Sequence, residues 1–179
     1  MNSKLYWIKG PWPGTLAISA RPRGGDWLED EVSGWRSAGI DLVVSLLTPQ
    51  ENQELELWGE SNLARARGLL FISLPTEDRG VPPCWDEASL AVAKIEEMLR
   101  QGRNVAVHCR QGIGRSGMIA AAVLVKDGSV PDDSLELVSD ARGLPLPETA
   151  EQREWVRKFS QREAPPAPFP LGATRISGK

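Results

Sequence analysis

Histidine and cysteine are scarce in this sequence: its 179 residues include one histidine, His108, and two cysteines, Cys84 and Cys109. A zinc site built from these residue types needs more ligands, which excludes a zinc finger and a histidine-rich catalytic zinc centre. Two cysteines cannot form a framework of several disulfides, which favours a reducing compartment. Because no G-x-S-x-G motif accompanies His108, a Ser–His–Asp hydrolase of that type is excluded as well.

Long hydrophobic runs and a strong positive charge are also missing. The longest uninterrupted apolar run is Met118–Val125, far shorter than the roughly 20 residues that a membrane helix requires. The first ten residues contain no apolar core long enough for a signal peptide. The net charge is −3 and the isoelectric point is about 5.3, which argues against a broad nucleic-acid contact. We therefore expect a cytoplasmic protein with no membrane segment and no nucleic-acid partner.

The composition that remains is that of a folded chain. Hydrophobic residues make up 41% and charged residues 25% of the sequence, which is ordinary for a globular protein. The length corresponds to about one domain. Residues 163–179 carry four prolines, which cannot continue a helix. We predict a single domain at 1–162, followed by a proline-rich C-terminal tail at 163–179.

Strands and helices are expected to alternate along this domain. Three pairs of residues have the spacing of a helix capping box: Asp26 with Glu29, Thr48 with Glu51, and Thr149 with Gln152. The helical stretch that begins at Thr48 is expected to break near Gly59. Strands are expected at 16–19, 41–47, 69–74 and 105–107, and further helices at 86–101, 115–126, 131–141 and 150–162. This order predicts an α/β fold with a central, mainly parallel sheet of about four or five strands and helices on both faces.

One segment combines several features of an anion-binding site. Residues 105–116 read Val-Ala-Val-His-Cys-Arg-Gln-Gly-Ile-Gly-Arg-Ser, which predicts a buried strand, a glycine-rich loop and the start of a helix. In such a turn the backbone N–H groups converge at the helix N-terminus and bind phosphate, and Arg115 can hold two phosphate oxygens in bidentate fashion. The predicted phosphate-binding residues are Arg110, Gln111, Gly112, Ile113, Gly114 and Arg115.

Cys109 lies at the other end of the same loop. The positive potential of the loop amides and of Arg115 favours the thiolate over the thiol, and a thiolate beside a bound phosphoryl group is a nucleophile. A buried structural cysteine is the alternative, since free cysteines are often buried. The combination of His108, both loop glycines, Arg115 and Ser116 around one cysteine makes that alternative the weaker one.

The segment resembles a known family of enzymes. His108-Cys109-x5-Arg115-Ser116 is similar to the signature loop of the cysteine-based protein tyrosine phosphatases. The upstream run 74–82, Leu-Pro-Thr-Glu-Asp-Arg-Gly-Val-Pro, resembles the general-acid loop of small dual-specificity phosphatases, especially the cyclin-dependent-kinase-associated phosphatase group. Residues 21–28 resemble small prokaryotic members. The resemblance covers about residues 14–160 and implies the corresponding protein tyrosine phosphatase-like fold of the dual-specificity type.

The resemblance implies a role for each motif residue. Cys109 is the nucleophile, and Asp78 is the acid that protonates the leaving oxygen and then acts as base on water. Glu77 is the alternative acid, and a plain turn role for Asp78 stays open. His108 orients the loop and supports the thiolate, or is simply a core histidine. Ser116 donates its hydroxyl to the thiolate, or merely starts a helix.

Two further residues have alternative interpretations. Gln152 resembles the glutamine that positions water in tyrosine phosphatases, but a capping partnership with Thr149 explains it equally well. Cys84 is expected to be a packed thiol, with a resolving role toward Cys109 as the alternative.

The predicted function is a cysteine-dependent phosphatase that hydrolyses phosphomonoesters through a phosphocysteine intermediate, without metal or cofactor. Its expected substrate is phosphotyrosine, with phosphoserine or phosphothreonine, in a phosphorylated protein or peptide. The same chemistry on a phosphoinositide or an RNA phosphate is the alternative, and the absence of lysine from the loop favours protein. A non-catalytic phosphate-binding module is the other alternative, although it would be expected to lack Cys109, Arg115 or Asp78. The sequence does not determine the oligomeric state.

Overall fold

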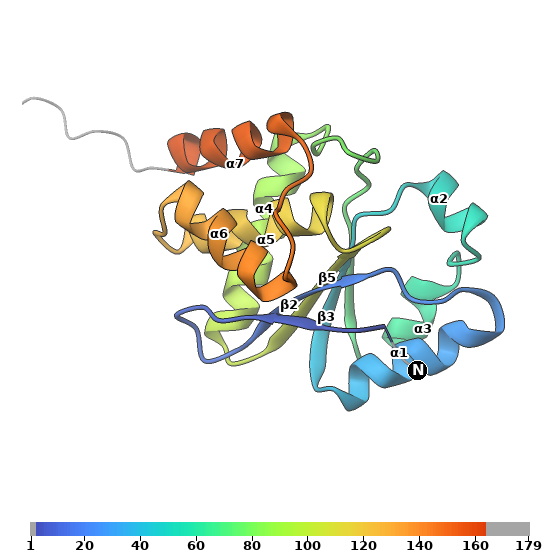
Figure 1. Ribbon diagram of the computed structural model, residues 1–179. Coiled ribbons are helices and arrows are strands. Elements are labelled where there is room, and N and C mark those ends of the chain that lie inside the picture. The colour runs from blue at the N-terminus through green and yellow to red at the C-terminus, as the bar shows by residue number, and fades with distance from the viewer. Residues whose placement is uncertain (1–2, 164–179) are drawn as a thin grey trace, which may run out of the picture.

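A computed structural model describes residues 3–163 and shows a five-stranded sheet between two layers of helices (Figure 1). The strand order is β1-β2-β5-β3-β4, and every neighbouring pair is parallel except the antiparallel pair of β1 and β2. The predicted α/β fold with a mainly parallel sheet is confirmed. The strands are β1 (Tyr6–Ile8), β2 (Leu16–Ala20), β3 (Ile40–Ser45), β4 (Leu70–Ser73) and β5 (Asn104–Cys109).

The two faces of the sheet are covered by different helices (Figure 1). One face packs against α4 (Trp85–Arg100), α5 (Gly114–Lys126), α6 (Pro131–Arg142) and α7 (Ala150–Glu163), and the other against α1 (Leu28–Ser37) and α3 (Glu60–Ala66). The short α2 (Pro49–Glu54) follows the carboxyl end of β3. No helix within residues 3–163 combines the length and the apolar character needed to cross a membrane.

The central strand β5 contributes to both layers. Val107 and Cys109 belong to the larger core under α4 and α5, whereas Ala106 belongs to the smaller core under α1 and α3. Successive side chains of a strand point to opposite faces. His108 and Cys109 therefore lie on opposite sides of the sheet.

The predicted start of α2 is confirmed in atomic detail. Thr48 Oγ1 accepts the N–H of Glu51 at 3.2 Å, and Glu51 Oε2 accepts the N–H of Thr48 at 3.0 Å. The predicted break near Gly59 is confirmed too, because α2 ends at Glu54 and α3 begins at Glu60.

Three expectations about elements need correction or fall outside the structure. Asp26 does not cap a helix: it lies in a 3-10 turn that the Gly25 N–H anchors to Glu56 O at 3.1 Å, and α1 starts only at Leu28. Strand β1 was missed, since three residues are too few to show periodicity. The predicted tail lies outside the described residues except for Glu163, which ends α7.

Candidate active site

The glycine-rich loop lies at the carboxyl end of the central strand β5, between β2 and β3. Open α/β sheets bind their ligands at this edge. Cys109 ends the strand, residues 110–113 form the loop, and Gly114 begins α5. Ile113 makes no side-chain cap on α5. The positive end of the helix dipole therefore faces the loop without a capping side chain, which favours a bound anion there.

Gly112 has a conformation and a position that a side chain would disturb. Its φ is +67°, and a Cβ on it would lie 2.4 Å from the carbonyl carbon of Ser19. The missing side chain lets the loop pack against the backbone at the end of β2. The turn of the loop thus depends on glycine at this position.

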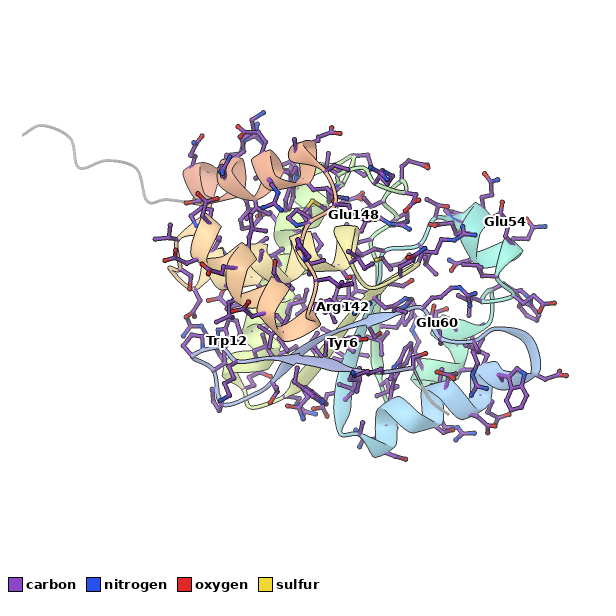
Figure 2. The ribbon with its side chains drawn as sticks, viewed as in Figure 1. Tyr6, Trp12, Glu54, Glu60, Arg142 and Glu148 are labelled. Carbon is purple, nitrogen blue, oxygen red and sulfur yellow. The ribbon has the colours of Figure 1, made fainter. Side chains whose placement is uncertain are left out.

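Arg142 of α6 binds two backbone carbonyls of the glycine-rich loop. Its Nε donates to Gly112 O at 2.9 Å and its Nη2 to Gln111 O at 3.4 Å, while its guanidinium lies 4.1 Å from the ring centre of Tyr6 in β1. Figure 2 shows Arg142 and Tyr6 side by side. In a trans peptide the N–H points opposite to the carbonyl. Arg142 thereby directs the N–H groups of Gly112 and Ile113 away from itself, toward the site.

Cys109 and Ser116 face each other at the N-terminus of α5. Cys109 is 2% exposed, and its Sγ lies 3.4 Å from Ser116 Oγ. A thiolate can only accept in this contact, so the Ser116 hydroxyl is then the donor. The two residues that the sequence placed at either end of the loop are therefore in direct contact.

Arg115 is buried and makes a bidentate ion pair with Glu51. Its Nη1 donates to Glu51 Oε2 at 2.7 Å and its Nη2 to Glu51 Oε1 at 2.9 Å. Burial opposes the charged form of Arg115, but the Glu51 hydrogen bonds and the charges of Cys109, Glu51 and Asp78 outweigh it and raise its pKa above the ordinary value. Glu51 thus fixes the orientation of the Arg115 guanidinium.

Sequence reasoning recognised Glu51 only as a capping residue. Burial raises the pKa of this carboxyl, but the hydrogen bonds from Arg115 and Thr48 and the charges of Arg115 and Arg110 hold it below the ordinary value. Arg110 Nη1 lies 3.7 Å from Glu51 and 3.8 Å from Glu54. The position of Glu51, just beyond the carboxyl end of β3, was the available signal for a role at the site.

Asp78 lies on the loop after β4 and contacts Arg115, which follows the glycine-rich loop. Arg115 Nη2 donates to Asp78 Oδ1 at 3.0 Å, and Nη1 donates to Thr76 O at 2.8 Å. The Asp78 side chain is 60% exposed, and the neighbouring Glu77 is exposed as well. The structure therefore brings Asp78, the predicted acid, into contact with Arg115.

Gln152 is buried at the start of α7 and points toward the site. Its backbone N–H donates to Thr149 Oγ1 at 3.1 Å, but its Nε2 donates to Gly80 O at 3.0 Å, so only half of the predicted capping box forms. A Cβ on Gly114 would lie 2.9 Å from Gln152 Oε1. That buried oxygen has no partner within residues 3–163, so it can accept from a water at the loop.

The two remaining predicted residues, His108 and Cys84, lie away from the contact between Cys109 and Ser116. His108 is fully buried beneath the loop, with Nε2 at 2.8 Å from Glu60 Oε1. Cys84 is half-buried and precedes α4. In the described part of the chain, no group of three or more His, Cys, Asp or Glu residues is placed to hold a metal ion.

Residues 19–129 match the family described as "Polymorphic toxin system, DSP-PTPase phosphatase". The chain belongs to this family. The matched range contains Cys109, Arg115 and Asp78. It includes the strands β3, β4 and β5 and the helix α5.

Similarity to individual proteins extends over more of the chain. The sequence is 24% identical to "Cyclin-dependent kinase inhibitor 3" of Rattus norvegicus over 142 residues, which is 76% of this chain and 65% of that protein. The crystal structure of kinase associated phosphatase, with its catalytic-site cysteine substituted by serine, has a TM-score of 0.83 at 19% identity and covers 91% of this chain and 97% of that one. PTPMT1 in complex with PI(5)P has a TM-score of 0.71 at 19% identity and covers 88% and 96%.

Proposed function

We propose that this DSP-PTPase family member hydrolyses phosphomonoesters of proteins through a phosphocysteine intermediate, with phosphotyrosine as preferred substrate and phosphoserine or phosphothreonine as further substrates. The observation that carries the proposal is the meeting of Cys109, Ser116, Arg115 and Asp78 at one end of the sheet. A single phosphatase domain at 1–162 is part of this proposal. It is supported by the one sheet with both helical layers that residues 3–163 form, in which α7 ends at Glu163. A cytoplasmic location stays a prediction.

The first chemical step is the attack of the Cys109 thiolate on phosphorus. The loop amides and Arg115 neutralise the phosphoryl oxygens, the bond from phosphorus to the ester oxygen breaks, and Asp78 gives its proton to the leaving oxygen. Because Asp78 occupies Arg115 Nη2 in the free site, the phosphoryl group takes its place there. Asp78 is then released toward the leaving group.

The second step regenerates the thiolate. Water attacks the phosphocysteine, Asp78 takes up one proton of that water, and the bond from sulfur to phosphorus breaks. Ser116 donates its hydroxyl to the departing sulfur, which lies 3.4 Å away. Gln152 Oε1, buried beside Gly114, accepts from the attacking water and holds it in line.

The charges of the residues around the glycine-rich loop favour a substrate with a single phosphate over a phosphoinositide head group. A head group with several phosphates needs several cations, whereas Arg110 lies within 3.8 Å of both Glu51 and Glu54. These carboxylates offset the charge of Arg110. The structural likeness to PTPMT1 makes a phosphoinositide the competitor to test.

The deciding experiment assays the wild-type chain in parallel on phosphotyrosine and phosphoserine peptides, on PI(5)P vesicles and on an RNA 5′-phosphate. We expect the highest kcat/KM on the phosphotyrosine peptides, and acid quenching should trap the phosphate on Cys109. Cys109→Ser should abolish turnover, and Cys84→Ser is the matched control that keeps it. Hydrolysis by Cys109→Ser, or a preference for the vesicles, would contradict the proposal.

A further inference from the structure

The carboxylate of Glu148 lies against the end of the glycine-rich loop. A Cβ placed on Gly114 would lie 2.4 Å from Glu148 Oε2 and 2.9 Å from Gln152 Oε1. Gly114 directly precedes Arg115 in the sequence. Figure 2 marks Glu148 on the connection between α6 and α7, close to the N-terminal end of α5. The mechanism above makes no use of this carboxylate.

The backbone that carries Glu148 is fixed on both sides. Before it, Leu146 is buried, and its N–H donates to Ser139 Oγ at 3.0 Å. After it, Thr149 Oγ1 accepts the N–H of Gln152 at 3.1 Å. These contacts hold the segment in place without a ligand. A group that binds to Glu148 therefore loses less of its affinity to the ordering of the protein.

Glu148 has no partner of its own in the described part of the chain. Its side chain is exposed, and its carboxylate makes no hydrogen bond or ion pair within residues 3–163. Beside the same glycine, Gln152 Oε1 is buried and also lacks a donor. A carboxylate and an amide oxygen can only accept hydrogen bonds. This side of the loop therefore offers acceptors to a bound molecule.

The arginines around the loop do not neutralise Glu148. Arg110 and Arg115 both lie at ion-pair distance from glutamates of α2. Arg79 approaches through its backbone, since its carbonyl accepts from Thr149 Oγ1 at 3.4 Å. Its side chain is exposed and makes no ion pair among the residues that the structure describes. A positive charge beside Glu148 is therefore left for a ligand to supply.

We propose that Glu148 is a specificity-determining residue that binds a lysine or arginine next to the phosphorylated residue of the substrate. Neighbouring residues of a peptide have Cα atoms about 3.8 Å apart, so a long basic side chain can reach from a phosphoryl group on the loop to the carboxylate beside Gly114. The ammonium or guanidinium then donates charge-assisted hydrogen bonds to Glu148. The proposal rests on the proposed function in taking the glycine-rich loop as the phosphate site.

The same carboxylate disfavours other substrates. An acidic residue or a second phosphate beside the phosphorylated group would face Glu148 without a counter-charge, and like charges in contact reduce affinity. The substrate class is therefore a phosphopeptide with a basic residue adjacent to its phosphorylated residue.

The test uses phosphotyrosine peptides that differ in one residue, which is arginine, alanine or glutamate at the position before or after the phosphotyrosine. At one of these positions we expect the wild type to have a kcat/KM about 3- to 5-fold higher for the arginine peptide than for the alanine peptide, the size of one partly solvated ion pair. The glutamate peptide should be the poorest substrate. The differences should lie in KM, because Glu148 contacts the flanking residue and not the reacting atoms.

Two substitutions of Glu148 assign the preference. Glu148→Gln should bring the ratio of arginine to alanine peptide to about one, and Glu148→Lys should favour the glutamate peptide. Glu151→Gln is the matched control, since Glu151 is an exposed glutamate in the first turn of α7 that is not among the nearest neighbours of Gly114. This variant should keep the wild-type ratio.

Peptide affinity for Cys109→Ser measures the same preference without turnover. Equal affinities for all the peptides, no binding of any of them, or an arginine preference that persists when Glu148→Gln is added would overturn the proposal. An arginine preference in affinity that depends on Glu148, in a protein whose wild type hydrolyses none of the peptides, would refute the phosphatase proposal alone.

Discussion

At the residue scale, each group of the site is held by a partner from a different part of the chain. Arg115 is oriented by Glu51, the loop carbonyls by Arg142, and the Gln152 amide by Gly80 O. These supporting contacts restrict the rotamers of the site residues, whose atoms must be positioned within a fraction of an ångström to stabilise the transition state. Removing a partner is therefore expected to slow the chemistry even where the reacting atoms remain.

Asp78→Asn distinguishes the role of Asp78 as general acid from its effect on phosphate binding. The amide cannot give up a proton to the leaving group, so hydrolysis of a tyrosyl phosphate should slow by roughly 10²–10⁴-fold and the falling limb of the pH–rate profile should disappear. Because Asp78 competes with substrate for Arg115 Nη2, the uncharged variant should bind vanadate at least as tightly as the wild type. The measurements are the pH profile of kcat/KM and vanadate inhibition.

The leaving group provides the internal check on Asp78. An aryl phosphate whose phenol is already acidic needs little protonation, so the loss should shrink on such a substrate. Glu77→Gln is the control on the same loop and should leave the profile near that of the wild type. A falling limb that survives in Asp78→Asn would instead transfer the acid role to Glu77.

At the element scale, the site is the junction of β5, the glycine-rich loop and α5. This junction could be predicted from sequence because its residues are contiguous: a buried strand, two glycines and a helix start carry local signals. The partners from other elements could not be predicted, since Glu51 and Arg142 reach the site only through the packing of α2 and α6 beside the loop. Glu51 shows this best: its capping role is local and was predicted, while its role on Arg115 depends on how β3 and β5 pair.

Gly112→Ala tests the geometry of that junction. An alanine Cβ would lie 2.4 Å from the Ser19 carbonyl carbon, which is backbone and cannot move aside. The loop should therefore be displaced, and phosphate binding as well as turnover should be lost. The measurements are vanadate affinity and kcat/KM on a phosphotyrosine peptide.

Gly68→Ala is the matched control for the backbone conformation. Gly68 also has a positive φ, +75°, but nothing lies within 4 Å of a Cβ there. This variant should cost only about 1 kcal/mol of stability from the left-handed conformation, with normal activity. Equal activity in Gly112→Ala and Gly68→Ala would show that close packing of the loop on β2 is not required.

At the scale of the whole molecule, the fold itself supplies the electrophilic groups of the reaction. Loop amides, the α5 N-terminus and Arg115 gather where a divalent cation would otherwise be needed. EDTA should therefore leave hydrolysis unchanged, whereas vanadate or a thiol alkylator should abolish it. The measurement is the rate on a phosphotyrosine peptide with and without each reagent, and restoration of an EDTA-treated sample by Mg²⁺ or Mn²⁺ would contradict the proposed chemistry.

The same ion pair that orients Arg115 also links global stability to pH. Burial raises the pKa of Glu51, but its hydrogen bonds and the charges of Arg115 and Arg110 lower it further, so the net pKa in the folded protein is below the ordinary value. As the pH falls, the Glu51 carboxylate therefore takes up a proton at a higher pH in the unfolded chain than in the folded protein. The stabilisation is complete above about pH 4.3, the ordinary value for glutamate, and is lost progressively as the pH drops toward the folded value.

Glu51→Gln should therefore lower the free energy of unfolding at pH 7 by about 3 kcal/mol, because the Arg115 charge stays buried without its partner. The free energy of unfolding should also depend less on pH below pH 5 in this variant. Denaturant unfolding between pH 7 and pH 3 measures both effects. Glu97→Gln is the control: the pKa of Glu97 is also lowered, first by the hydrogen bond from Lys94, but this pair is exposed. Its effect should be small and should vanish in salt, because water and ions screen exposed pairs. An acid slope in Glu51→Gln as steep as that of the wild type would show that the buried pair does not govern the acid limit of the fold.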